Sequence, residues 1–436
     1  MKRLISCVLA LLYVMAGFAS GTWILHGKEY RVDTLYHAYI GPGTTQTSIK
    51  LAGPVNLRVF YTTTDLKNEN VDVRAIKHKD TLTGLGTVSN AAESHSTSNR
   101  SYFAGINADF FSSSMPCGIT VVDGEVYCSD QASGWSLFGI DANKIPYSGG
   151  GDFYVKLTAP DYSTAELSAM NLERGTNGLV LYSSRKGANT GTDSNGSEVV
   201  LIPDGEGNFL TPGATVRMRV QGNPSHAGSM PIPDDGYILS GSGTKESFVS
   251  NLSEGDVVEV RCAIRFNGFT GGKIQQALGG CPMLVSGGKV LDTENALDHL
   301  TSAQPRTAVG YNAEKNKLVM LVADGRSSIS VGPISKVLAD IMIYAGCSEA
   351  MNFDGGGSST FYVKGEGVIN QPSDGSERSV TDGLYLSTDA PQNDVTITTI
   401  RFMDYAKTLN QGDAYTPVIY GYNQYLSLIH ISEPTR

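Results

Sequence analysis

The sequence predicts a strand-rich α+β fold in which mixed sheets are combined with a few helices. Short runs of β-branched and aromatic residues recur between turn signals along the 436 residues, which is typical of strands joined by tight turns. Glycine is abundant, with 50 residues, and only 17% of the residues are charged. The chain is long enough to bury a large core and to form one large domain or two.

Residues 1–20 have the pattern of a cleaved secretory signal peptide. A basic start, Met1-Lys2-Arg3, precedes the apolar run 4–18, and small residues follow it. The apolar run is shorter than the ~20 residues that a membrane-spanning helix needs. We therefore expect an exported protein without a membrane span, either secreted or periplasmic.

Residues 21–99 form a predicted N-terminal β-rich region. Residues 57–61 and 71–76 read as strands, and the polar run 89–100 as a short helix or loop. Another strand is expected at 104–111, where Asn107 and Asp109 share one face because residues two apart in a strand point the same way.

Residues 317–363 are predicted to form a strand-helix-strand-turn-strand unit. The apolar strand 317–323 ends at Asp324, Pro333 can open a helix with apolar residues at helical spacing, and Gly346 suits its end. The second strand ends near Asp354. The two aspartates then lie at matching strand ends, where polar sites of α/β units tend to form.

The turn after this second strand has the composition of a polar binding site. In the strand, Asn352 and Asp354 point to one face while Met351 and Phe353 point to the other. Three glycines allow a sharp turn that brings backbone amides close to a ligand. We call the following residues the polar cup: Asn352, Asp354, Gly355, Gly356, Gly357, Ser358 and Ser359.

Two familiar motifs and one plain structure compete for this turn. A phosphate-binding P-loop would need a Gly-Lys-Ser/Thr ending, which is absent, and a nucleophile elbow would need a glycine after the serine and a histidine base. An ordinary glycine-rich hairpin turn remains as the alternative. Three other polar segments favour a binding site. Arg306-Thr307, Arg326 and Glu377-Arg378 surround the strand–turn–strand part of the predicted unit. Taken singly, each arginine is more often a surface ion-pair partner.

The order of these segments resembles that of the phosphodiester glycosidase family. The resemblance spans roughly residues 100–390, the expected catalytic domain, and Cys281 stands where the family commonly has glycine. The segments that carry it are 105–111, 171–201, 279–284, 305–307, 324–326, 352–360 and 377–380.

The resemblance implies hydrolysis of a sugar-1-phosphodiester at the anomeric carbon, in the manner of an alpha-N-acetylglucosaminidase. The partner would be a phosphorylated carbohydrate of a glycan or envelope polymer. Asp354, Asp324 and Arg306 are the expected catalytic residues, with the division of labour between the carboxylates left open. The expected substrate-binding residues are Asn107, Asp109, Thr307, Arg326, Asn352, Gly355, Gly356, Gly357, Ser358, Ser359, Glu377 and Arg378.

Other partners and cofactors are judged by charge and spacing. A net charge of −10 without a basic run argues against nucleic acid. We expect no cofactor, although Asp109, Asp324 and Asp354 could share calcium or another hard divalent cation. No EF-hand spacing supports such a site. The rival function is that of a non-catalytic exported glycan-binding or envelope protein.

The cysteines and the C-terminal end complete the expectations. Cys117 and Cys128 bracket an Asp-Gly hairpin turn, which predicts a disulfide between them, and Cys262 with Cys281 is a weaker pairing. The absence of any C-x-x-C pair argues against zinc. Residues 391–424 should add one or two strands, and 425–436 read as a non-native tail outside the fold.

Overall fold

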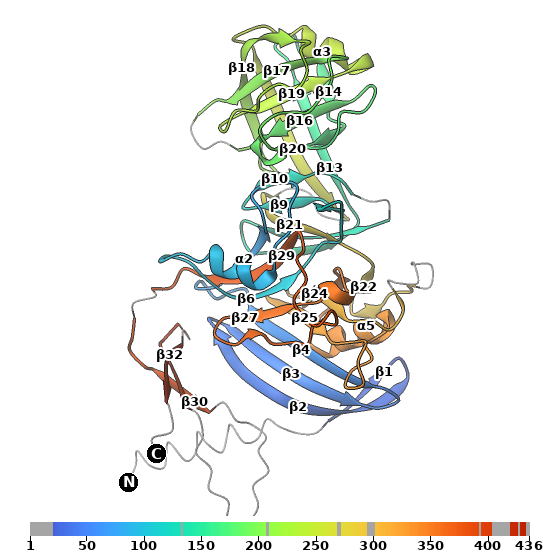
Figure 1. Ribbon diagram of the computed structural model, residues 1–436, viewed down its shortest axis with the longest axis vertical. Coiled ribbons are helices and arrows are strands. Elements are labelled where there is room, and N and C mark those ends of the chain that lie inside the picture. The colour runs from blue at the N-terminus through green and yellow to red at the C-terminus, as the bar shows by residue number, and fades with distance from the viewer. Residues whose placement is uncertain are drawn as a thin grey trace, which may run out of the picture.

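The computed structural model describes residues 21–131, 134–205, 209–267, 272–293, 301–391, 394–402, 419–425 and 428–432. Two packed sheets form the body, a lobe built from residues 151–266 lies at one end of the long axis, and a small C-terminal sheet lies beside the body (Figure 1). Among the described residues no helix is long and apolar enough to cross a membrane.

The larger sheet of the body has nine strands. In spatial order the strands are β1 (Gly21–Leu25), β2 (Lys28–Gly41), β3 (Thr44–Ala52), β4 (Asn56–Asp65), β25 (Lys317–Ala323), β24 (Arg306–Tyr311), β26 (Glu349–Asn352), β22 (Met283–Ser286) and β23 (Lys289–Val290). Strand β24 lies between β25 and β26 and pairs antiparallel with both, so β25 and β26 are parallel to each other.

The second sheet packs against one face of the first. Val309, Met320 and Met351 of the first sheet share a core with Ile106 and Leu384 of the second. The strands of this sheet are β28 (Gly367–Val368), β27 (Phe361–Val363), β6 (Ser101–Asn107), β29 (Asp382–Thr388) and β5 (Asp72–Lys77).

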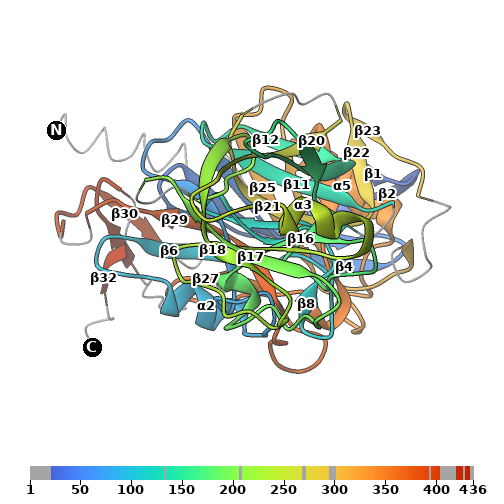
Figure 2. The ribbon, with the colours of Figure 1, turned by 90° about the horizontal axis from the view of Figure 1, so that it is seen from above.

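One helix covers each outer face of this pair of sheets. Helix α5 (Ser335–Tyr344) packs on the nine-stranded sheet, and α2 (Val88–Ser94) packs on the second sheet. Seen from above, the two helices lie on opposite flanks of the body (Figure 2). The body is therefore a four-layer helix–sheet–sheet–helix stack, within the predicted α+β class.

The chain from 317 to 363 crosses both sheets. It runs through β25, α5 and β26, turns at the 3₁₀ segment η3 (Gly356–Ser358), and enters β27 of the second sheet. The helix begins at Ser335, two residues later than Pro333 suggested, and ends before Gly346 with φ +98°. Met351 and Phe353 both lie in the core between the sheets, as their alternation predicted.

A third sheet joins the body to the lobe. Its strands are β10 (Glu125–Cys128), β9 (Thr120–Val122), β21 (Ile274–Gly280), β11 (Ser136–Asp141) and β12 (Pro146–Gly149). The lobe sheet contains β14 (Thr164–Glu166), β13 (Gly151–Thr158), β20 (Val257–Phe266), β18 (Thr215–Ser225), β17 (Ser197–Pro203), β19 (Tyr237–Gly241), β16 (Leu179–Ser183) and β15 (Ala169–Met170). Val121 and Ala277 of the third sheet share one apolar core with Leu181 and Val260 of the lobe.

Two boundaries expected from the sequence differ from the sheets observed. Residues 21–99 do not form a sheet of their own, because β1–β4 belong to the sheet of β24–β26 and β5 belongs to the sheet of β6. At the other end, β30 (Thr399–Phe402), β31 (Ile419–Tyr422) and β32 (Leu428–Ser432) form a three-stranded sheet. Residues 428–432, expected to lie outside the fold, thus pair as an edge strand. The predicted signal peptide lies outside the described residues.

The disulfide prediction is wrong. All five cysteines of the described residues are free thiols. Across the β9–β10 hairpin Cys128 is paired with Thr120, so Cys117 lies three residues beyond the partner position. Its amide donates instead to the Phe110 carbonyl, at 2.9 Å. Cys262 and Cys281 are separated as well, since one lies in lobe strand β20 and the other follows β21.

Candidate active site

Three strand ends meet at one edge of the nine-stranded sheet. Arg306 opens β24 and pairs with Ala323 at the end of β25, while Ala308 pairs with Asn352 at the end of β26. Because β24 runs antiparallel to both neighbours, its first residue lies at the edge where they end. Asp324 follows β25 directly and Asp354 comes two residues after the end of β26, so both reach this edge.

The second sheet reaches the same edge through Asn107, the last residue of β6. The Asn107 amide donates to the Asp354 carbonyl at 2.7 Å, and its oxygen accepts from the Thr307 hydroxyl at 2.8 Å and from the Thr360 amide at 3.1 Å. Asn107 and Thr307 are both fully buried. Through these contacts the two residues fix the Asp354 backbone.

The glycine turn is shaped by the arginines packed on it. Gly356 has φ +61°, and a Cβ there would lie 3.0 Å from Arg326 Nη2, while a Cβ on Gly357 would overlap the Arg378 guanidinium. Only glycine suits both positions. The Gly356 amide donates to the Pro305 carbonyl at 2.9 Å. This amide is therefore already hydrogen-bonded within the protein.

Asp354 is the partly exposed carboxylate of the polar cup. Burial raises its pKa to about 6. Hydrogen bonds from the Ser358 hydroxyl and the Gly355 amide, together with the positive charge of Arg378, lower the pKa and so limit this increase. The negative charge of Asp382 adds to the increase. A carboxylate with a pKa near neutrality can exchange protons at physiological pH, which is a property of catalytic acids and bases.

The three predicted arginines have different environments. Arg306 is 2% exposed, and burial together with the charge of Arg326 lowers its pKa to about 10, so it stays cationic at neutral pH. Arg326 is exposed and donates from Nε to Gln304 Oε1 at 2.6 Å. Arg378 is exposed too, and it forms an ion pair with Asp374 and donates to Ser358 Oγ at 3.3 Å. Within the described ranges, neither Arg306 nor Arg326 has a carboxylate within 4.0 Å.

Asp324 is enclosed by a different segment. It is 2% exposed, and its Oδ1 accepts from the Gln371 amide at 2.8 Å and from Asn370 Nδ2 at 3.3 Å. Burial raises its pKa, while these two hydrogen bonds and the charge of Arg58 oppose the increase. Asp324 thereby ties the loop that follows β28 to the end of β25.

Two other predicted ligands have structural partners. Glu377 accepts from the Ser89 amide at 2.9 Å and from the Ser89 hydroxyl at 2.5 Å, so it stabilises the first turn of α2. Asn352 donates to the Cys281 carbonyl at 2.7 Å and to the Phe353 carbonyl at 2.6 Å. These contacts orient the chain around the cup.

Asp382 and Lys77, which were not predicted from the sequence, lie buried beside the predicted Asp109. Asp382, at the start of β29, accepts from the Asp109 amide at 2.9 Å, and Asp109 accepts from the Gly118 amide at 2.9 Å. Burial and the neighbouring Asp382 charge raise the pKa of Asp109 well above its ordinary value. Lys77 is 1% exposed and donates to the Thr381 carbonyl at 3.1 Å. The one available signal was the polar Thr381-Asp382 pair that opens an otherwise apolar strand.

Buried polar atoms without a protein partner concentrate at this edge. Such atoms are rare in folded proteins because each costs free energy unless water or a ligand binds it. Six of them belong to the residues just described: Asp109 Oδ1, Arg306 Nε, Asp324 Oδ2, Asn352 Oδ1, Ser359 Oγ and Thr360 Oγ1. The cup is therefore the part of the body best suited to bind a polar molecule.

The shared-cation alternative names Asp109, Asp324 and Asp354 as ligands. In the part of the chain that the structure describes, no group of three or more His, Cys, Asp or Glu residues is placed to hold a metal ion. Asp109, Asp324 and Asp354, the three expected ligands, have separate protein partners.

Comparison with known proteins agrees with the sequence resemblance. Residues 213–387 match the phosphodiester glycosidase family. The resemblance is thus confirmed for the segment that carries β24–β27, the polar cup and all three arginines. Asn107 and Asp109 lie outside the matched glycosidase segment.

Individual relatives are distant or match only in part. An uncharacterized SPbeta prophage-derived protein of Bacillus subtilis (strain 168), YomE, is 40% identical over 88 residues, which are 20% of this chain and 13% of that protein. A hypothetical protein from Synechocystis has a similar fold, with a TM-score of 0.61 at 16% identity, over 79% of this chain and 62% of its own. A Burkholderia pseudomallei K96243 protein described as exported has a TM-score of 0.61 at 18% identity, over 84% of this chain and all of its own.

Proposed function

We propose that this protein hydrolyses a sugar-1-phosphodiester at the anomeric carbon, as an exported enzyme that acts on a glycan or envelope polymer. The observation that carries the proposal is Asp354, a carboxyl group whose pKa burial raises to about 6, within the electrostatic reach of Arg306 and Arg378. The match to the phosphodiester glycosidase family supports the same chemistry.

Arg306 is suited to bind the phosphodiester. A phosphodiester carries one negative charge, which a guanidinium group can bind through two parallel hydrogen bonds. Arg306 is buried and has no carboxylate partner among the described residues; its Nη2 donates to the Ser302 carbonyl at 2.5 Å, while its Nε has no hydrogen-bond partner in the protein. Arg326 can add a second positive charge from the exposed side of the glycine turn.

Asp354 is suited to the bond-breaking step. The bond between the anomeric carbon and the phosphate oxygen breaks with its electron pair leaving on the phosphate, and the ionised Asp354 stabilises the positive charge that develops on the sugar. A water molecule then supplies the hydroxyl group, and its proton passes to a carboxylate. A phosphate leaving group is a weak base, so this reaction depends less on a general acid than ordinary glycoside hydrolysis.

The test is sugar release from a panel of sugar-1-phosphodiesters, including an N-acetylglucosamine-1-phosphodiester. We expect turnover by the wild type and loss of it in Asp354→Ala and Arg306→Ala. Asp235→Ala, which removes an exposed lobe carboxylate, is the matched control and should keep the wild-type rate.

Two outcomes would contradict the proposal in different ways. If the wild-type protein binds glycans but releases no sugar from the panel, the result favours the alternative hypothesis of a non-catalytic exported glycan-binding protein. Full activity of Asp354→Ala would leave the reaction class standing and remove Asp354 from the chemistry.

A further inference from the structure

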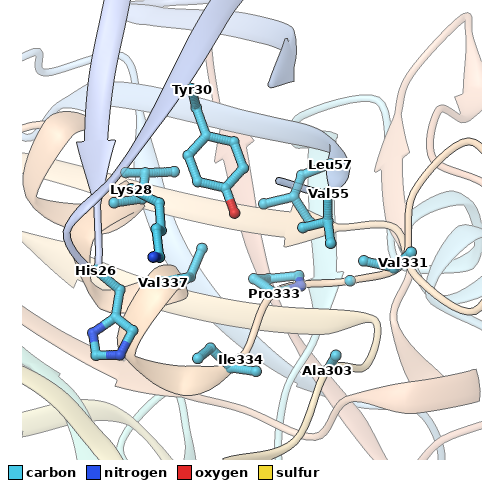
Figure 3. A pocket seen from close by; sticks show the side chains of 12 residues that line it. His26, Lys28, Tyr30, Val55, Leu57, Ala303, Val331, Pro333, Ile334 and Val337 are labelled. Atoms are coloured by element: carbon cyan, nitrogen blue, oxygen red, sulfur yellow. The ribbon is translucent and has the colours of Figure 1, made fainter. Parts of the chain in front are cut away.

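A second hollow lies away from the polar cup, on the face of the nine-stranded sheet that α5 covers. It has a volume of about 210 Å³ and lies between the start of β2 and the segment that leads into α5 (Figure 3). No residue of the polar cup lines it. We call it the β2–α5 pocket. Its walls include Leu25, Leu57, Val337, Pro333 and Ile334.

The walls of the β2–α5 pocket are apolar and well supported. Leu25 and Leu57 are fully buried and Val337 is 7% exposed, so these side chains are held by the core beneath. Val55 and Val331 are 39% and 38% exposed and stand at the rim. A concave apolar surface of this kind favours an aliphatic group, because binding removes apolar area from water.

One end of the pocket is polar and cationic. Tyr30 lines this end and is 3% exposed. Figure 3 shows this hydroxyl pointing into the pocket, between Lys28 on one side and Val55 and Leu57 on the other. Lys28 and Tyr30 are two residues apart in β2 and therefore share one face of the strand.

The charges around this end favour an anion. Lys28 forms no ion pair with the described residues, and the exposed His26 ring lies beside it (Figure 3). Glu29 lies between Lys28 and Tyr30 in β2 and so points to the opposite face of the strand, and Asp340 Oδ2 accepts from the His26 amide at 2.6 Å. The Tyr30 hydroxyl and the unpaired ammonium group of Lys28 both donate hydrogen bonds, so they match an acceptor with negative charge.

We propose that the β2–α5 pocket binds an aliphatic anion. A short hydrocarbon chain lies against Leu57, Val331 and Val337, and a carboxylate or phosphate head accepts hydrogen bonds from Tyr30 Oη and Lys28 Nζ. This proposal uses none of the residues of the polar cup and does not depend on the proposed function.

The test is titration calorimetry of the full chain with octanoate and with octyl phosphate, both below their micellar concentrations. We expect saturable binding of one molecule per chain, and the tighter of the two probes identifies the head group. Lys28→Met and Tyr30→Phe should each weaken binding about tenfold, the effect of losing one hydrogen bond to a charged group. Octyltrimethylammonium, with the same chain and the opposite charge, should bind at least about tenfold more weakly.

Blocking variants and a matched control locate the binding. Ala303→Trp and Val331→Trp place a large ring at the exposed rim and should each abolish binding, with circular dichroism to show that the fold is kept. Lys50→Met removes an exposed lysine from β3 and should leave affinity unchanged. The proposal is overturned if neither anion binds, if binding survives in folded blocking variants, or if the cationic probe binds as tightly as octanoate.

Discussion

The ends of β25 and β26 lie in one sheet, run in the same direction and each carry an aspartate, but their surroundings differ. At the end of β25, the chain around Asn370 and Gln371 closes over Asp324 and supplies two hydrogen bonds to one of its oxygens. At the end of β26, the glycine turn leaves Asp354 partly exposed beside arginines. Aspartates at similar positions in a sheet are therefore enclosed or open according to what covers them.

The sharpest test of this comparison exchanges each carboxylate for its amide. Asp354→Asn removes the ionisable group from the open strand end and should lower kcat/KM by about 10³-fold, within the range of an acid–base or nucleophilic group. Asp324→Asn keeps the acceptor oxygen and should change kcat/KM by less than about tenfold. Both are measured as sugar release from the best substrate of the panel. Equal losses in the two variants would show that the two strand ends do not differ in function.

The second prediction concerns the arginines at the same edge. Arg306→Lys should lower kcat/KM by about 10²-fold, because a single ammonium cannot reproduce a buried guanidinium that binds phosphate through two bonds. Arg326→Lys, at an exposed position, should cost about tenfold or less, since solvent screens its charge. If the order of the two effects is reversed, the phosphate is held on the exposed side of the turn.

The third prediction concerns stability at the pH at which Asp354 ionises. Folding raises the pKa of this carboxyl from 3.8 to about 6, so the neutral form is favoured in the folded state. Its contribution is fully present below pH ~4 and is lost as the pH rises through about 6. Asp354→Asn should therefore be more stable than the wild type by about 1–3 kcal/mol at pH 7.5, and this gain should disappear at pH 4.

Chemical unfolding across this pH range measures the effect. Asp235→Asn, an exposed substitution in the lobe, serves as the control and should follow the wild-type curve. A gain that is the same at pH 4 and pH 7.5 would show that the amide stabilises by packing and not by removing a buried charge.

The last prediction tests the structural role of Asp324. Asp324→Ala removes the acceptor used by Gln371 and Asn370 and should lower the free energy of unfolding by about 1–3 kcal/mol. Asp324→Asn should keep most of that stability because it keeps one oxygen. Urea unfolding compares the two variants. Equal destabilisation would mean that the charge of Asp324, and not its hydrogen-bonding geometry, holds the loop.

Local patterns predicted the elements around the site well. The alternation of residues 350–353 correctly placed Met351 and Phe353 in the core, and the helical spacing after Pro333 predicted a helix that lies at 335–344. These features depend on neighbours in the chain, so a local pattern contains them. The Cys117–Cys128 bridge failed because the position of Cys117 depends on the loop and not on the hairpin turn alone.

Long-range contacts decide which polar side chains around the site already have protein partners. Glu377 carries a carboxylate that could bind a ligand, but both of its oxygens accept hydrogen bonds from Ser89, which is 288 residues away. Asp382 meets Asp109 across 273 residues, and no spacing rule connects them. A side chain's chemistry can be read from its type, whereas its availability depends on what the fold brings against it.

The sequence by itself determined the α+β class, the strand ends at Asp324 and Asp354, and the resemblance to phosphodiester glycosidases. These follow from periodicity and from residue types at fixed spacing. Only the tertiary structure decided that Asp324 is enclosed while Asp354 is open, that Arg306 is buried without a carboxylate partner, and that Tyr30 turns its hydroxyl into a second pocket. The physical reason is that burial and hydrogen bonding determine the protonation state of a side chain and whether it can contact a ligand. The residues that bury it and bond to it come from segments far apart in the chain.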